Sequence, residues 1–308
     1  MNKPQVNPGS ERADESVLRI LRRLFRTLES NVEGVIGDDH IDFLHDLRVA
    51  NRRTRTLLSQ IKGVVPASVG DVFAMESKWL GAVTGPCRDL DVMLLDLDSY
   101  RQNPDRDESA LGPLQKFLED QRKVKRDEVC AALQSARFRH LMNEWHRFLD
   151  TGIEAGTEAP LASSAINTVA GPRILKAFKR IWKRGRGIGA DAPAAVFHRI
   201  RIDGKKLRYL LEFFSSLFPG ATASRFIKEL KRLQDILGDF NDTEIQLAYI
   251  GEFVESCTAS ARALAATSRL SEYTAERQRV LRAEFVDQFA IFASDPNRHL
   301  YKKTFKTS

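Results

Sequence analysis

A pattern of cations occurs twice in the chain and constrains its fold more than any other feature. The segment HDLRVANRRTR begins at His45, and the related segment HRIRIDGKKLR begins at His198, 153 residues later. The same shift places Asp242 on Asp89, well outside these segments. One constant shift that matches separated blocks predicts two copies of one unit, related by a pseudo-twofold axis.

The rest of the sequence favours an all-α fold. Of the 308 residues, 43% are hydrophobic and 29% are charged, as in globular proteins. Apolar residues recur every three or four positions, as at Val17, Leu21, Leu24 and Leu28. No β alternation or hairpin signal competes with this helical period.

Two polar stretches divide the helical segments. Residues 151–165 form a polar connector near the middle of the chain, and residues 98–113 are rich in loop formers. We therefore expect one domain over 11–292, made of repeat one (15–150), a linker (151–165) and repeat two (166–292). Residues 1–10 are expected to form a disordered tail and 293–308 a C-terminal tail.

Several features favour a cytoplasmic protein. The N-terminal segment has no apolar core of a signal peptide, and no stretch approaches the roughly 18 apolar residues of a membrane span. The three cysteines form no CxxC pair, which is compatible with a reducing compartment. We expect no membrane association.

Each repeated helix presents its cations on one face. At 100° per residue, His45, Arg48, Arg52 and Arg55 fall within about 80° of one another, opposite an apolar stripe. In the second copy, the corresponding side chains are His198, Arg201, Lys205 and Arg208. Stacked like charges destabilise a helix. Their repetition at equivalent positions favours a binding surface for a polyanion over the alternative of a merely solvated face.

The helices that precede these faces add further cations. The formal net charge is +7, which points to an anionic partner. The first such helix carries Arg19, Arg22, Arg23 and Arg26, and its counterpart carries Lys176, Lys179, Arg180, Lys183, Arg184 and Arg186. Arginine offers a planar fork to phosphate oxygens and lysine a mobile point charge, so a phosphate chain suits such a lining.

The doubled pattern H-x-x-R-x-x-x-[RK]-[RK]-x-R, followed in each half by Gly-x-x-[RN]-Asp, resembles the CHAD domain family. The matching blocks are HDLRVANRRTRTLL, GPCRDLDVMLLDL, FHRIRIDGKKLRYLLEFF and LQDILGDFNDTEI. The resemblance implies two antiparallel four-helix bundles about a pseudo-twofold axis, with a basic central cavity that binds inorganic polyphosphate. Asn241 departs from the pattern where the first half has Arg88, so the resemblance implies an asymmetric site.

The resemblance and the basic faces together give the predicted polyphosphate-binding residues. From the first half they are Arg19, Arg22, Arg26, His45, Arg48, Arg52, Arg53, Arg55, Lys78 and Arg88. From the second half they are Lys176, Lys179, Arg180, Lys183, His198, Arg201, Lys205, Lys206, Arg208 and Lys231. Polyphosphate granules or polyphosphate-metabolising enzymes are candidate partners.

Two other functions remain as alternatives. A nucleic-acid binder would use the same cations, but single-strand binders interleave aromatic residues with them. A phosphate-processing enzyme would need a metal held by carboxylates, and the sequence has no GxxxxGK[ST], HExxH or GxSxG motif. We expect no catalysis, metal or cofactor. Asp89, Asp91 and Asp242 are interpreted as groups that orient basic side chains or cap helices.

Overall fold

The computed structural model describes residues 8–102, 108–153, 158–256 and 259–306. Within these ranges all regular structure is helical, which confirms the all-α prediction. The α-helices are α1 (Ala13–Ser30), α2 (Val32–Gly37), α3 (Ile41–Gln60), α4 (Ala67–Arg101), α5 (Gly112–Leu133), α6 (Ala136–Thr151), α7 (Ile166–Gly185), α8 (Ala194–Phe213), α9 (Gly220–Ser256), α10 (Ala261–Phe292) and α11 (Asp295–Phe305). Short 3-10 turns occupy η1 (Pro8–Ser10), η2 (Glu108–Leu111) and η3 (Ser215–Leu217).

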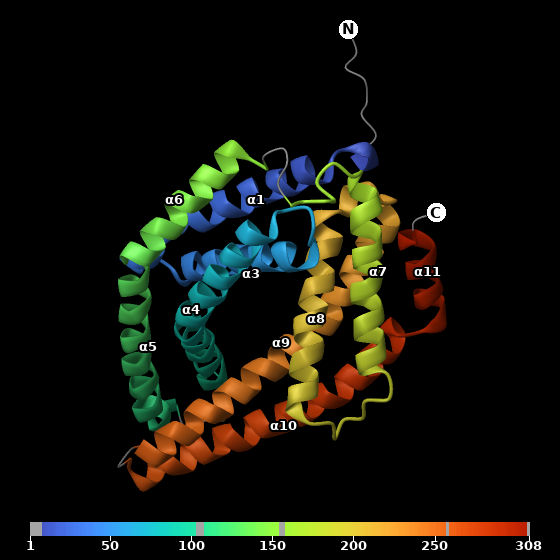
Figure 1. The fold of residues 1–308 in the computed structure, drawn as a ribbon. Coiled ribbons are helices and arrows are strands. Elements are labelled where there is room, and N and C mark those ends of the chain that lie inside the picture. The colour runs from blue at the N-terminus through green and yellow to red at the C-terminus, as the bar shows by residue number, and fades with distance from the viewer. Residues whose placement is uncertain (1–7, 103–107, 154–157, 257–258, 307–308) are drawn as a thin grey trace.

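The helices lie as two groups that meet at several places (Figure 1). Helices α1 to α6 make up one group, and α7 to α11 make up the other. Helix α3 contacts α8, and α4 contacts α9. Helix α5 also contacts α9 and α10, and α1 contacts α7. None of the described helices combines the length and the apolar character needed to cross a membrane.

Three helix pairs begin at equivalent places in the two groups. Helix α7 starts 153 residues after α1, α8 starts 153 residues after α3, and α9 starts 153 residues after α4. These separations equal the shift between the repeated sequence motifs. The contacts α3–α8 and α4–α9 therefore each join a helix to the helix that carries the matching motif.

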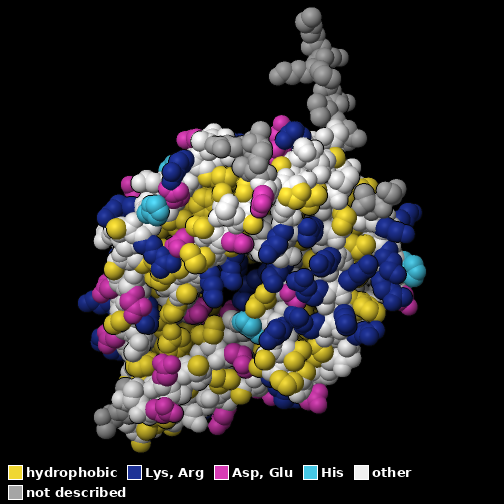
Figure 2. Space-filling view, viewed as in Figure 1, with side chains coloured by type: hydrophobic (Ala, Val, Ile, Leu, Met, Phe, Trp, Pro, Cys, Tyr) yellow, Lys and Arg dark blue, Asp and Glu magenta, His cyan; other side chains and the backbone are white. Residues whose placement is uncertain are grey.

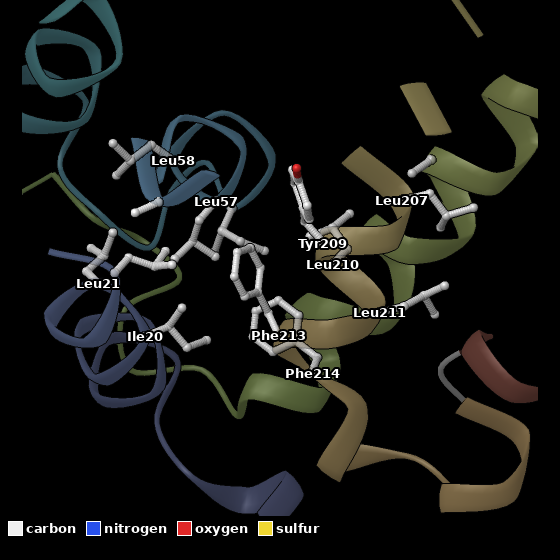
Figure 3. Close-up of a cluster of buried hydrophobic side chains, with 14 of the residues drawn as sticks. Ile20, Leu21, Leu57, Leu58, Leu207, Tyr209, Leu210, Leu211, Phe213 and Phe214 are labelled. Carbon is white, nitrogen blue, oxygen red and sulfur yellow. The ribbon is translucent and has the colours of Figure 1, made fainter. Parts of the chain in front are cut away.

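A continuous apolar core holds α1, α3 and α8 together. Figure 3 shows Leu21 of α1, Leu57 of α3 and Phe213 of α8 converging on one cluster. Leu57 is fully shielded from solvent, and Leu21 and Phe213 are buried. A second cluster lies between α4, α5, α9 and α10. Because both clusters use the apolar faces, the opposite faces of α3 and α8 are left to carry charge.

The segment predicted to be a linker, residues 151–165, is described in part. Helix α6 ends at Thr151 and α7 begins at Ile166, with no regular helix in the described residues between them. Leu161 anchors this segment through a hydrogen bond from its amide to the carbonyl oxygen of Gly63, at 2.8 Å. Residues 154–157 lie outside the described ranges.

The expected loop over 98–113 and the two tails need correction. Helix α4 continues to Arg101 and α5 starts at Gly112, so both helices extend into that stretch, whose centre (103–107) lies outside the described residues. Pro8–Ser10 forms a 3-10 turn, while residues 1–7 lie outside the described part. The prediction of a loose C-terminal tail is wrong for residues 295–305.

Helix α11 packs against α7 through aromatic rings. Tyr301 stacks between Phe178 and Phe226, with ring centroids 3.9 and 3.8 Å away, and it has no exposed surface. Phe305 is also buried. Helix α11 is short and largely polar in sequence. It can still pack against the core because Tyr301 and Phe305 bury a large apolar area.

Candidate functional site

The packing of α3 against α8 brings cations of both helices into one group. We call Arg48 and Arg52 of α3 with Arg201 and Lys205 of α8 the central cluster. All four side chains are half-buried. Arg52 is close enough to influence the other three, because its positive charge lowers the pKa of Arg48, Arg201 and Lys205. Residues more than 140 positions apart in sequence thus share one electrostatic environment.

Lys205 has the most perturbed environment of the four. Burial, followed by the charges of Arg201 and Arg52, lowers its pKa to about 6. A lysine with a depressed pKa loses its proton on folding, so it opposes folding at neutral pH. That penalty shrinks as the pH rises toward the ordinary lysine value.

The central cluster lacks direct ion pairs. Within the described ranges, no carboxylate oxygen lies within 4.0 Å of a charged nitrogen of Arg48, Arg52, Arg201 or Lys205. Removing a cation from water has a cost that a nearby anion offsets. The positive charge of the central cluster is therefore available to bind an anion.

Hydrogen bonds to uncharged groups fix the two arginines that α3 contributes to the central cluster. Arg48 donates from Nη1 to the carbonyl oxygen of Gly81 at 3.1 Å and to the Thr84 hydroxyl at 2.9 Å. Arg52 donates from Nε to the Tyr209 hydroxyl at 2.9 Å. These bonds orient the guanidinium groups without neutralising them. The Nε atoms of Arg48 and Arg201 are buried and have no partner among the described atoms.

Two carboxylates at equivalent positions border the cluster. Burial raises the pKa of both Asp89 on α4 and Asp242 on α9. Arg48 and Arg201 act in the opposite direction on Asp89, and Arg201 does so on Asp242. The two acids are near enough for Asp242 to raise the pKa of Asp89 further. Both acids therefore act on the cluster through their charge, without an ion pair to its arginines within the described residues.

A third acid closes one end of the cluster. Glu212 on α8 accepts from Nη1 of Arg53 at 2.6 Å, and its other oxygen lies 3.3 Å from Nε of Arg208. The Arg53 guanidinium also lies over the Tyr209 and Phe213 rings, 5.2 and 5.0 Å from their centroids. Arg53 and Arg208 therefore share an internal partner, unlike the four residues of the central cluster.

The histidines lie at the other end of the repeated helices. Burial and then the charge of Arg88 lower the pKa of His45, which disfavours its cationic form. Nδ1 of His198 lies 3.3 Å from Oδ1 of Asn241. Because Asn241 replaces the Arg88 of the first half, the two histidines have different neighbours, as the asymmetry of the motif predicts.

The predicted outer cations differ between α1 and α7. Arg19 pairs with Glu11, and Arg22 donates to the carbonyl oxygen of Leu149, although both side chains are exposed, as is Arg26. These arginines line a groove of about 1070 Å³ between α1 and the end of α8, which Glu212 also lines. On α7, Arg180 approaches the buried Asp203. The predicted cations exposed elsewhere are Arg55, Lys78, Lys176, Lys179, Lys183 and Lys231.

Lys206 turns toward α7 rather than toward α3. Its Nζ lies 3.5 Å from Oδ1 of Asp203, which also pairs with Arg184. The structure thus separates Lys206 from its sequence neighbour Lys205. Arg184 and Tyr209 are absent from the predicted site. Tyr209 lies 157 residues after Arg52 in the sequence, so no local sequence pattern predicts their contact.

Metal ligation finds no support in the side-chain arrangement. Across the described residues, no group of three or more His, Cys, Asp or Glu side chains is placed to hold a metal ion. Cys87 is buried, and burial raises the pKa of its thiol to about 12. Cys257 lies outside the described residues.

The face in Figure 2 is hollowed near its centre, and lysine and arginine side chains gather around that hollow. They continue over the side where Figure 1 places α8 and α7. The fold and these side chains together define an all-helical protein in which cations of two equivalent helices converge.

Comparison with known proteins identifies the family. The family model of the CHAD domain matches residues 19–251, and the chain therefore belongs to the CHAD domain family. This confirms the resemblance found from the repeated motif.

Two solved structures are similar to this chain. The first is the crystal structure of the CHAD domain from the plant Ricinus communis, with 26% identity and a TM-score of 0.75 over 94% of this chain and 93% of that chain. The second is PptA from Streptomyces chartreusis, with 15% identity and a TM-score of 0.71 over 91% of this chain and 99% of that one. The second likeness supports the fold alone. No curated protein matches the chain.

Proposed function

We propose that the protein binds inorganic polyphosphate at the central cluster without catalysing its turnover. The observation that carries this proposal is a set of three arginines and one lysine from two helices, all half-buried, with no carboxylate in ion-pair contact within the described residues. We further propose that the two helix groups are duplicated four-helix bundles and that the hollow in Figure 2 is the mouth of the binding cavity.

A phosphate chain matches the chemistry of this cluster. Each phosphate unit offers several oxygens, so neighbouring units can accept from Arg52 and Lys205 at once. Burial strengthens such bonds because water competes less for the donors. The hydrogen bonds that already hold Arg48 and Arg52 reduce the ordering needed on binding.

Nucleic acid fits the cluster less well. Tyr209 is the aromatic side chain in contact with Arg52, and it has no exposed surface on which a base could stack. The rings of Phe213 and Phe214 are also in the core. A chain without bases therefore suits the site better than an oligonucleotide does.

Calorimetry with long-chain polyphosphate tests the proposal. We expect binding whose log Kd changes linearly with log salt concentration, because the ligand releases counterions. An oligonucleotide at equal phosphate concentration should compete poorly. Incubation of the protein with polyphosphate and divalent metals should release no phosphate. The proposal fails if polyphosphate does not bind, if the oligonucleotide wins, or if turnover is sustained.

The depressed pKa of Lys205 predicts proton uptake on binding. Bound phosphate should raise this pKa from about 6 toward the ordinary lysine value. Between the free and bound values the complex holds one proton more, so affinity should fall as the pH rises above about 6. Calorimetry near pH 7.5 in buffers of different ionisation enthalpy should detect uptake of about one proton. In Lys205→Met this uptake should disappear, and its persistence would assign the proton to another group.

A further inference from the structure

The charges outside the central cluster are distributed unequally between the two equivalent helices α1 and α7. Asp203 on α8 is buried, with a side chain only 6% exposed, and it holds three cations. Arg184 pairs with it directly, and Lys206 and Arg180 lie 3.5 and 3.8 Å away. One buried carboxylate thus orients three cations from two helices and leaves them with a net positive charge.

These three cations keep part of their surface in solvent. The side chains of Arg180, Arg184 and Lys206 are 39%, 33% and 30% exposed, so an anion can still reach them. Lys176, Lys179 and Lys183 are exposed on the same helix, α7, and have no ion pair within the described ranges. We call these six residues the α7 cation surface. Lysine and arginine side chains continue from the hollow over the side where α8 and α7 lie (Figure 2), so this surface borders the hollow.

The first half of the chain lacks the same arrangement. A shift of 153 residues places Thr27, Asn31 and Ala50 where the second half has Arg180, Arg184 and Asp203. The first half therefore has no counterpart of Asp203, and neither of the two arginines that Asp203 binds in the second half. On α1, Arg19 is paired with Glu11. The other arginines of α1 line a groove that also holds three acids, Glu11, Glu15 and Glu212, which offset most of their charge. The pseudo-symmetry of the helices is thus broken in their charge.

We propose that a polyphosphate chain longer than the central cluster leaves it over the α7 cation surface and not along α1. This inference rests on the proposed function. The three cations oriented by Asp203 form the first contact beyond Lys205, and the exposed lysines of α7 extend it. Because a short chain would be held by the central cluster alone, the affinity of the protein should depend on chain length.

The duplication supplies a matched pair of variants. Lys176 on α7 is equivalent to Arg23 on α1, and both side chains are exposed. We would compare K176Q with R23Q, since each removes one cation from the same helical position. Titrations with tripolyphosphate and with long-chain polyphosphate, over a range of salt concentrations, would measure both affinity and salt slope.

The two variants should behave differently. K176Q should bind long-chain polyphosphate about threefold more weakly, with a salt slope lower by about one, because one phosphate contact is lost. Its affinity for tripolyphosphate should change by less than about 1.5-fold, and R23Q should change both affinities by less than about 1.5-fold. Equal losses in the two variants, or an unchanged long-chain affinity in K176Q, would overturn the inference. If the unmodified protein binds neither ligand, the proposed function itself fails.

Discussion

Replacing Arg52 and Lys205 by glutamine should lower the affinity for long-chain polyphosphate by at least about 100-fold. A hydrogen bond to a charged group contributes about 1.5–3 kcal/mol, and the variant removes one such donor from each helix of the central cluster. The loss should differ from the sum of the losses in the two single variants if both side chains bind the same ligand, because such contacts are coupled. Calorimetry or filter binding at constant salt would measure it.

The control variant should lose two positive charges outside the central cluster. Lys116 on α5 and Arg279 on α10 are exposed and pair only with acids of their own helices. Lys116→Gln with Arg279→Gln should change the affinity by less than about threefold, since long-range attraction to exposed charges is screened by salt. The thermal midpoint of R52Q/K205Q should stay close to that of the unmodified protein. Similar affinity losses in both variants would show that net charge, and not the central cluster, governs binding.

Replacing Tyr301 by alanine should lower the free energy of unfolding by about 3–5 kcal/mol. This ring fills the space between Phe178 and Phe226, and its loss would leave a cavity where α11 meets α7. Urea denaturation followed by circular dichroism should show a lower midpoint. An unchanged midpoint would mean that α11 contributes little to the stability of the fold.

Tyr301→Phe is the matched control for this effect. The Tyr301 hydroxyl is buried with no hydrogen-bond partner among the described atoms, and burial raises its pKa. Removing an unsatisfied hydroxyl while keeping the ring should leave stability unchanged or raise it by about 1 kcal/mol. A loss as large as that in the alanine variant would show that the hydroxyl has a partner after all.

Periodic patterns made the helices predictable from sequence. The apolar spacing of α1, α3 and α8 leaves one face for the core, and the shift between the motifs equals the shift between the helix starts. Helix α11 was missed because Asp295–Phe305 is mostly polar. Its docking depends on Tyr301 and Phe305 meeting rings of distant helices, which no local period reveals.

The candidate site was predictable only in part. A helical projection places Arg48 and Arg52 on one face, and the structure brings them beside Arg201 and Lys205. The same projection gives no information on long-range partners. Glu212 engages Arg53 across 159 residues, and Asp203 draws Lys206 away from Lys205. Such contacts depend on how helices cross, so they require the folded chain.

The most direct test of the central claim is a crystal structure of the protein with a short polyphosphate bound. We expect phosphate oxygens within hydrogen-bond distance of both Arg52 on α3 and Lys205 on α8. A ligand bound only to outer cations, or held by one of the two helices alone, would contradict the claim that the two repeated helices form a single site.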